Sequence, residues 1–258
     1  MNTTGYLGPL PDSRPRIFAH RGLVFQGESQ VVDENTLDSF ELALAAGADY
    51  LETDLQLSKD GIPVLFHDYD LTRLVGSKTP ISSLTLEQLQ KIKLPFGGGI
   101  PSLKEALEKF PTAKFNLDFK TKGTESPGMS VVNSLGATER VLVSSFSESI
   151  RQRALSHSPA KIASSAGSSK VLSSYSLSRL NISRALANSL KDIDALQIPT
   201  KKFGIDFTHP RFVEALLNQQ KEIHYWTIND PTEMTSLFLL GAHGIVTDRT
   251  DIATKVFS

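Results

Sequence analysis

The stretch from residue 50 to residue 68 reads YLETDLQLSKDGIPVLFHD, and it decides the fold expected for this chain. Two acids, Glu52 and Asp54, lie two positions apart inside an apolar run, and a second apolar run ends in His67 and Asp68. An Asp-Gly pair between two such runs is a strong hairpin signal, because both turn residues must accept a positive φ. The stretch therefore predicts a strand that carries acids and returns through a tight turn to a histidine.

A two-residue turn at positions 60–61 places Asp54 opposite His67. It also places Glu52 opposite Tyr69. Side chains two apart on a strand share a face, so Glu52, Asp54 and His67 are expected to converge. Two carboxylates this close repel each other unless a cation or a shared proton lies between them. The alternative is that the acids decorate the solvent face of an antiparallel ribbon, and the stretch alone does not separate the two.

Short apolar runs alternate with amphipathic segments along the rest of the chain. We expect strands at residues 16–19, 50–57, 62–66, 114–119, 140–145, 161–163, 195–198, 224–228 and 244–247. We expect helices at residues 36–46, 85–92, 103–110, 148–155, 177–190, 210–220 and 231–240. This alternation predicts a parallel sheet. With the run at 62–66 set aside as a hairpin partner, eight parallel strands in 258 residues favour a (β/α)₈ TIM barrel over an open doubly wound sheet.

The length fits one domain, so a single domain over residues 1–258 is expected. Two helix-like pieces separated by the Gly-rich sequence LPFGGGI at 94–100 follow the hairpin. They predict an insertion at about residues 69–101, on the face of the barrel where the strands end. The Ser-rich tract at 164–178 is expected to be surface loop and helix entry.

The composition excludes several kinds of protein. There is no cysteine, which excludes disulfides, thiolate metal sites and cysteine nucleophiles. The net charge of −1 gives no sign of a nucleic-acid partner, and no apolar run approaches the ~18 residues of a membrane span. The first residues lack a basic segment followed by an apolar one, so we expect a cytoplasmic protein without integral membrane association. The sequence does not determine the oligomeric state.

Ionisable residues cluster at the ends of the predicted strands, which is where TIM barrels carry their chemistry. Three carboxylates without cysteine call for a hard cation, and they predict a site for one divalent ion, Mg²⁺ or Ca²⁺. The expected ligands are Glu52, Asp54 and Asp118.

Arg21 and Lys120 add positive charge beside this site, which suits an anionic substrate such as a phosphate. His20 and His67 flank it, as a general acid and a general base would. The alternative for each residue is a structural ion pair, for example between Arg21 and Glu34, and the sequence leaves that choice open.

These residues, in this order, resemble the glycerophosphodiester phosphodiesterase family almost end to end. The resemblance rests on AHRG at 19–22, ENT at 34–36, LETDLQLSKDGIPVLFHDYDLTR at 51–73, NLDFK at 116–120, SSFS at 144–147, YWTIN at 225–229 and GIVTD at 244–248. It implies a TIM barrel hydrolase that cleaves glycerophosphodiesters, small molecules of lipid and glycerol metabolism, to sn-glycerol 3-phosphate and an alcohol. It also implies that the glycerol 2-hydroxyl is the nucleophile and that a cyclic phosphate is then opened by water.

The resemblance assigns roles to individual residues. Glu52 and Asp54 match metal ligands, and Arg21 and Lys120 match phosphate contacts. His20 and His67 match the family's catalytic acid and base.

The chain departs from the family at two places. Asp118 stands where glutamate is usual, which puts the metal preference in doubt, and Asp33 stands where proline is common. The loop at 22–34 is longer than usual and is a candidate for shaping the headgroup pocket. Trp226 is a candidate for stacking on a quaternary ammonium headgroup, although a tryptophan at a barrel mouth equally serves packing.

Two other functions compete with this one. Phospholipase D-like enzymes that cleave lysolipids or sphingolipids share the histidine and acid pattern, but the insertion and the lack of cysteines argue against that branch. A catalytically silent binder of phosphorylated ligands is a different class of protein, and the presence of both histidines argues against it. The identity of the headgroup alcohol and activity on lysolipids are not determined by the sequence.

Overall fold

The computed structural model describes residues 5–11 and 14–258, so residues 1–4 and 12–13 of the expected domain lie outside it. Its main sheet contains eight parallel strands in the order β8-β7-β6-β4-β1-β13-β12-β9. A bridge between Ser165 and Ala195 joins the two outer strands, so the barrel is nearly closed. The parallel strands are β1 Arg16–His20, β4 Tyr50–Leu57, β6 Lys114–Phe119, β7 Val141–Ser144, β8 Ala163–Ser164, β9 Ala195–Ile198, β12 Glu222–Tyr225 and β13 Gly244–Thr247. The predicted TIM barrel is confirmed.

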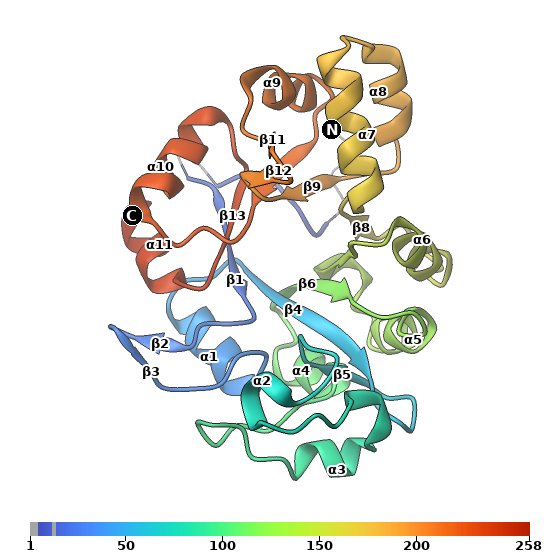
Figure 1. Cartoon of the computed structure of the whole chain (residues 1–258), viewed down its shortest axis with the longest axis vertical. Helices are drawn as coiled ribbons and strands as arrows, with labels where there is room; N and C mark the ends of the chain where they lie inside the picture. Colours follow the sequence, from blue (N-terminus) through green and yellow to red (C-terminus); the bar gives the residue numbers. More distant parts are fainter. Residues whose placement is uncertain (1–4, 12–13) are drawn as a thin grey trace.

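Helices surround the strands, as Figure 1 shows. They are α1 Leu37–Ala45, α4 Leu103–Lys109, α5 Glu125–Ser134, α6 Glu148–Ser156, α7 Ser168–Arg179, α8 Ser183–Leu190, α9 Pro210–Asn218, α10 Pro231–Leu240 and α11 Thr250–Val256. Their ends follow local chemistry: Asp230 caps α10 by accepting from Glu233 N, Pro231 occupies its first turn, and Gly241 ends it with φ 112°. A 3₁₀ turn, η2 Thr138–Arg140, precedes β7.

Alternation along each strand separates two environments. On β4, Leu51 and Leu55 face outward into an apolar layer shared with α1, α4 and α5. Residues 52, 54 and 56 alternate with these leucines and face the barrel interior. This is why β4 is buried on both faces and yet carries acids.

The barrel interior is layered along its axis. Its middle layer is aromatic: Phe18 stacks on Tyr50 at 4.5 Å, and Tyr6 from the N-terminal segment packs against Tyr50. One pleat further, at the carboxyl ends of the strands, His20 is in register with Glu52. The charged layer therefore rests on a packed aromatic floor.

The predicted register of the hairpin is wrong by one residue. Strand β5 Pro63–Leu65 pairs with β4 so that Leu55 lies opposite Leu65, and Phe66 N donates to Asp54 O. Neither Asp54–His67 nor Glu52–Tyr69 is a strand pair. The turn spans residues 58–62 and only Gly61 takes a positive φ, so it has more residues than the two-residue turn predicted from Asp-Gly. His67 lies beyond β5, where the ladder no longer dictates its direction.

The segment at residues 69–101, for which an insertion was predicted, forms a small layer outside the barrel, at the lower edge of Figure 1. It contains α2 Thr72–Val75, η1 Ile81–Ser83 and α3 Leu86–Gln90. Its apolar side chains pack on the hairpin residues Val64 and Phe66. The layer therefore extends the hairpin and holds it in place.

The structure also shows the conformation of the Ser-rich tract and of the loop at 22–34. The Ser-rich tract at 164–178 is mostly helical, because α7 begins at Ser168, and the helix expected at 177–190 is broken at Asn181, which has φ 59°. The loop at 22–34 contains a short hairpin, β2 Phe25–Gln26 with β3 Ser29–Gln30, and none of its residues lines the cavity described below. In the described ranges, 5–11 and 14–258, no helix has both the length and the apolar character that crossing a membrane requires.

Candidate active site

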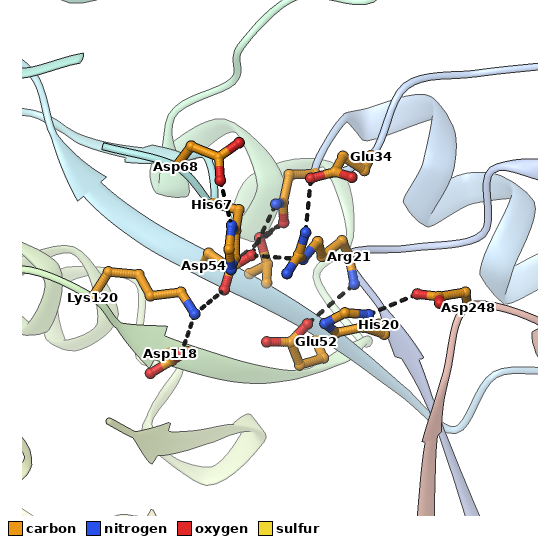
Figure 2. A network of polar contacts seen from close by, with 12 residues as sticks. His20, Arg21, Glu34, Glu52, Asp54, His67, Asp68, Asp118, Lys120 and Asp248 are labelled. Atoms are coloured by element: carbon orange, nitrogen blue, oxygen red, sulfur yellow. Dashed lines mark hydrogen bonds and ion pairs between the residues drawn. The ribbon is translucent and has the colours of Figure 1, made fainter. Parts of the chain in front are cut away.

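A cavity of about 260 Å³ opens at the carboxyl ends of the barrel strands. The structure brings all the residues singled out in the sequence to its wall: His20, Arg21, Glu52, Asp54, His67, Asp118, Lys120 and Trp226. Figure 2 shows the charged members of this set in one polar network. Their convergence was expected, although the hairpin register from which it was partly inferred is wrong.

The His-Arg-Gly sequence forms the turn that leaves β1. Arg21 and Gly22 both have positive φ, and a Cβ on Gly22 would lie 2.3 Å from Ser39 Oγ, so glycine is required there. The amide of Arg21 donates to both the backbone and the carboxylate of Glu52, at 3.0 and 3.1 Å. This turn therefore ties His20 and Arg21 to the acidic strand.

Each histidine of the cavity is bound by an aspartate. His20 Nδ1 lies 2.7 Å from Asp248 Oδ1, and His67 Nδ1 lies 2.7 Å from Asp68 Oδ1. A carboxylate only accepts, so Nδ1 carries the proton in both rings and Nε2 is the nitrogen left for a ligand. Burial lowers the pKa of His20, but the Asp248 hydrogen bond and the charge of Glu52 outweigh burial and raise it.

The aspartates are themselves held. Asn229 Nδ2 donates to Asp248 at 2.8 Å, while Arg73 from the insertion donates to Asp68 at 2.6 Å. Arg73 also forms a two-point contact with Glu34 at 2.6 and 3.0 Å. His67 is thus oriented from the segment after β5, and His20 from the loops that follow β12 and β13.

The acids and the cations of the cavity form one cluster. Lys120 Nζ lies 2.8 Å from Asp54 and 2.7 Å from Asp118, and Arg21 Nε lies 3.2 Å from Asp54. Burial raises the pKa of Asp54, but Lys120 and Arg21 outweigh it and lower that pKa to about 2. Burial and the neighbouring charge of Asp54 raise the pKa of Glu52 to about 7. Burial also raises the pKa of Asp118, against the effect of Lys120.

The predicted metal ligands are the right chemical type but are not arranged around one point. Within residues 5–11 and 14–258, no group of three or more His, Cys, Asp or Glu residues is placed to hold a metal ion. The ammonium of Lys120 lies between Asp54 and Asp118 instead. Among the described residues, Asp118 Oδ1 is nevertheless buried without a hydrogen-bond partner, and all the donors are carboxylate oxygens, which suit a hard divalent cation. The donor set therefore fits such an ion once Lys120 moves from between the two aspartates.

The role expected for Arg21 as a phosphate contact and the alternative of a brace to Glu34 are not exclusive. Arg21 Nη1 does lie 3.1 Å from Glu34 Oε1. Yet Arg21 also lines the cavity and contacts Asp54. The ion pair with Glu34 therefore orients a guanidinium that remains in the cavity wall.

Sequence reasoning missed two polar residues that position the cluster. Asn35, with φ 56° and buried, donates to Asp54 at 3.1 Å and accepts from Thr53 at 2.7 Å. Gln56 donates to the backbone carbonyls of His67 and Asp68, at 3.2 Å each. Asn35 belongs to the ENT motif, which was a usable signal, and Gln56 continues the i, i+2 face of Glu52 and Asp54.

The far wall of the cavity is aromatic. Trp226 meets Phe146 edge to face, with ring centroids 5.7 Å apart. Lys120 Nζ lies 5.3 Å from the centroid of the Phe146 ring. The charged cluster and the aromatic wall are therefore neighbours.

Comparisons with known proteins agree with this geometry. The sequence model of the glycerophosphoryl diester phosphodiesterase family matches residues 20–252. A Mycobacterium tuberculosis protein named "Probable glycerophosphodiester phosphodiesterase 2" is 33% identical over 92% of this chain and 89% of its own length. The chain belongs to the glycerophosphoryl diester phosphodiesterase family and is a phosphoric diester hydrolase.

Solved structures share the fold. A glycerophosphodiester phosphodiesterase from Agrobacterium tumefaciens superposes with a TM-score of 0.75 at 23% identity, covering 94% of this chain and 98% of that one. A phosphodiesterase from Oleispira antarctica, solved with the product sn-glycerol-3-phosphate, gives a TM-score of 0.73 at 24% identity, covering 94% and 96%. These similarities establish a common barrel.

Proposed function

We propose that this protein hydrolyses glycerophosphodiesters to sn-glycerol 3-phosphate and an alcohol, using His20 and His67 as the proton-transfer pair. The observation that carries the proposal is that two Nδ1-bound histidines line the same cavity as an acid–cation cluster. Nε2 of each ring is left to move a proton, which is the arrangement required at the two ends of a phosphoryl transfer. The product complex of the Oleispira antarctica neighbour supports the choice of product.

The cations of the cavity bind the phosphate. Arg21 presents a planar guanidinium that Glu34 and Asp54 orient, and Lys120 supplies a second positive charge. Both are buried enough for their charges to act in a low dielectric, with side chains 17% exposed.

Enzymes of this family are generally dependent on a divalent metal. In this chain Glu52, Asp54 and Asp118 would hold Mg²⁺ or Ca²⁺, since they are the carboxylates of the cavity wall. A divalent ion held there would neutralise part of the phosphate charge.

The reaction proceeds in two balanced steps. The glycerol 2-hydroxyl attacks phosphorus while one histidine Nε2 takes its proton and the other protonates the departing alcohol oxygen, leaving a cyclic phosphate. Water then opens the ring with the proton movements reversed, which yields sn-glycerol 3-phosphate. Asp68 and Asp248 keep Nδ1 protonated throughout, so that only Nε2 exchanges protons.

The test is release of glycerol 3-phosphate by metal-stripped protein titrated with Mg²⁺, Ca²⁺ and Mn²⁺. We expect metal-dependent release that falls ~10²-fold or more in kcat in His20→Ala and in His67→Ala, the usual scale for a general acid or base. His157→Ala is the control, because His157 is exposed at the end of α6. Wild-type rates in either cavity variant would remove that histidine from the mechanism.

A different set of outcomes would support the competing functions. Metal binding without release from any glycerophosphodiester would favour the silent binder of phosphorylated ligands. Release of a lysophosphatidic product from lysolipids, with none from deacylated diesters, would favour the lysolipid-cleaving branch.

A further inference from the structure

One lysine of the cavity wall is surrounded by aromatic rings. Lys202 Nζ lies 5.2 Å from the centroid of Phe146, 5.5 Å from Phe203 and 5.5 Å from Trp226. The rings come from three separate loops, after β7, at the turn between β10 Lys201–Lys202 and β11 Ile205–Asp206, and after β12. We call Phe146, Phe203 and Trp226 the aromatic cage.

The cation in the cage has no acidic partner. Lys202 forms no ion pair with any carboxylate in the part of the chain that the structure describes, whereas Lys120 nearby contacts two aspartates. Among the described side chains, its ammonium therefore contacts ring faces and no carboxylate. Three faces within ~6 Å of one charge form the arrangement by which proteins recognise quaternary ammonium ligands.

We propose that the aromatic cage is the subsite for the alcohol headgroup, that it takes a quaternary ammonium alcohol of the choline class, and that the Lys202 ammonium occupies it when no substrate is bound. This inference rests on the proposed diesterase function and names the substrate class of the same cavity. Lys202 is then an internal competitor that leaves when substrate enters.

The exchange is favourable because the two cations differ in hydration. A lysine ammonium is compact and strongly hydrated, so its contact with the rings is weak and it returns readily to water when it swings out. Lys202 is exposed, so this movement requires no rearrangement of the core. A trimethylammonium group is weakly hydrated and carries methyl groups that pack on the rings.

The cage is also in the right place for a headgroup. Phe146 is shared: Lys120 of the charged cluster lies 5.3 Å from its centroid and Lys202 lies 5.2 Å from it. A diester whose phosphate is bound at Lys120 therefore directs its alcohol past this ring into the cage. Phe203 is 89% exposed and Phe146 is 50% exposed, so both rings are free to adjust around a ligand.

Direct binding tests the cage without turnover. Titration calorimetry with choline and tetramethylammonium on wild type, Lys202→Ala and Lys201→Ala is the first experiment. We expect Lys202→Ala to bind both cations roughly threefold to tenfold more tightly, because the competitor is gone. Lys201 is the matched control, an exposed neighbour that does not line the cavity, and Lys201→Ala should bind like wild type.

Turnover then tests selectivity. We expect the ratio of kcat/KM for glycerophosphocholine over glycerophosphoglycerol to rise in Lys202→Ala and to fall roughly threefold or more in Phe146→Leu and in Phe203→Leu, which keep apolar volume but lose the π face. In Lys202→Ala, kcat/KM for glycerophosphoethanolamine, whose ammonium is strongly hydrated, should rise less than kcat/KM for the choline diester.

Two results would overturn the proposal. One is that Lys202→Ala binds the quaternary cations no better than wild type. The other is that it lowers kcat/KM for all the diesters alike, which would make Lys202 a phosphate contact instead. These results are distinguishable from a failure of the diesterase function itself, in which no diester would be cleaved but cation binding could still be measured.

Discussion

The chemistry of the cavity depends on hydrogen bonds made at the back of each catalytic ring. Asp248 fixes His20, and Asp68 fixes His67, by accepting from Nδ1 at 2.7 Å. Either aspartate acts through its histidine, so it is a positioning residue. Its removal should change the protonation of the ring as well as the rate.

We therefore expect Asp248→Asn to lower kcat by roughly 10- to 100-fold, since the amide still fills the space but no longer favours the protonated ring. Asp248 raises the pKa of His20, so its loss lowers that pKa. The limb of the pH–rate profile that reports His20 should move to lower pH. The measurement is kcat/KM against pH in both proteins, and Asp248→Asn should have no further effect in a His20→Ala background. An unchanged profile would show that Asp248 does not act through His20.

Asp118 is the residue at which the chain departs from its family, and we propose that it is a metal ligand. In the described part of the chain its Oδ1 has no hydrogen-bond partner, and a glutamate at this position, one methylene longer, would carry the carboxylate further into the cavity. We expect Asp118→Glu to change the order of preference among Mg²⁺, Ca²⁺ and Mn²⁺ and Asp118→Asn to weaken metal binding. Calorimetric metal titration measures this without turnover. Identical metal profiles in all three proteins would mean that Asp118 is not a ligand.

The residues that line the cavity were predictable from sequence because a barrel carries polar side chains to one end of every strand. The residues that hydrogen-bond to them were harder to predict. Asp248 lies 228 residues from His20, and only the closure of the barrel brings the two together. Asn35 acts through a positive φ that no composition argument supplies.

At the scale of elements, strand positions followed from hydrophobic pattern, but register did not. The Asp-Gly pair does mark the turn between β4 and β5, and Gly61 does take a positive φ. Asp60, however, accepts from Ser58 Oγ at 2.6 Å and from Leu86 N at 3.0 Å, so contacts to α3 help to set the conformation of the turn. The register of the β4–β5 hairpin therefore depends in part on a contact with α3, which lies later in the chain.

The insertion is fastened to the barrel through Asp33. Its carboxylate accepts from Phe96 N at 3.0 Å and from Gly98 N at 3.2 Å, and the side chain is buried. The proline common at this position has no such acceptor, so this chain holds its Gly-rich segment by a charge-assisted contact.

We expect Asp33→Ala to leave the amides of Phe96 and Gly98 without their charged acceptor and to destabilise the protein by about 1–3 kcal/mol. Hydrogen exchange should rise first at residues 94–100, while β1 and β13 stay protected. The matched control is Asp38→Ala, since Asp38 is exposed in the first turn of α1. Equal protection of residues 94–100 in Asp33→Ala and wild type would show that this contact does not hold the insertion.

At the scale of the whole molecule, the barrel is closed at its amino-terminal end by an ion pair between distant strands. Arg16 of β1 forms two contacts of 2.9 Å with Glu222 of β12, and His224 Nε2 lies 2.9 Å from the same carboxylate. Arg16 also donates to the hydroxyl of Tyr50 at 3.0 Å. The pattern of alternating strands predicted this barrel, but it gave no sign of the pair, because Arg16 and Glu222 read as ordinary strand-edge charges.

Burial raises the pKa of Glu222, but hydrogen bonds from His224 and Arg16 outweigh it and lower that pKa to about 2. A carboxylate with a lowered pKa stabilises the fold above its unfolded pKa of ~4.5 and loses that contribution as the pH falls toward 2. The shift sets an upper limit of about 3 kcal/mol at neutral pH.

Glu222→Gln should therefore lower the free energy of unfolding at pH 7 by up to about 3 kcal/mol, because it leaves the buried Arg16 guanidinium without its counter-charge. The difference from wild type should shrink steadily between pH 4.5 and pH 2, where the native carboxylate also becomes neutral. Urea unfolding of both proteins at pH 7, 4.5 and 3 measures it. Since the pair lies at the end of the barrel opposite the cavity, kcat at 25 °C should not change. A constant difference in stability across this pH range would mean that the loss in the variant comes from packing rather than from the charge of Glu222.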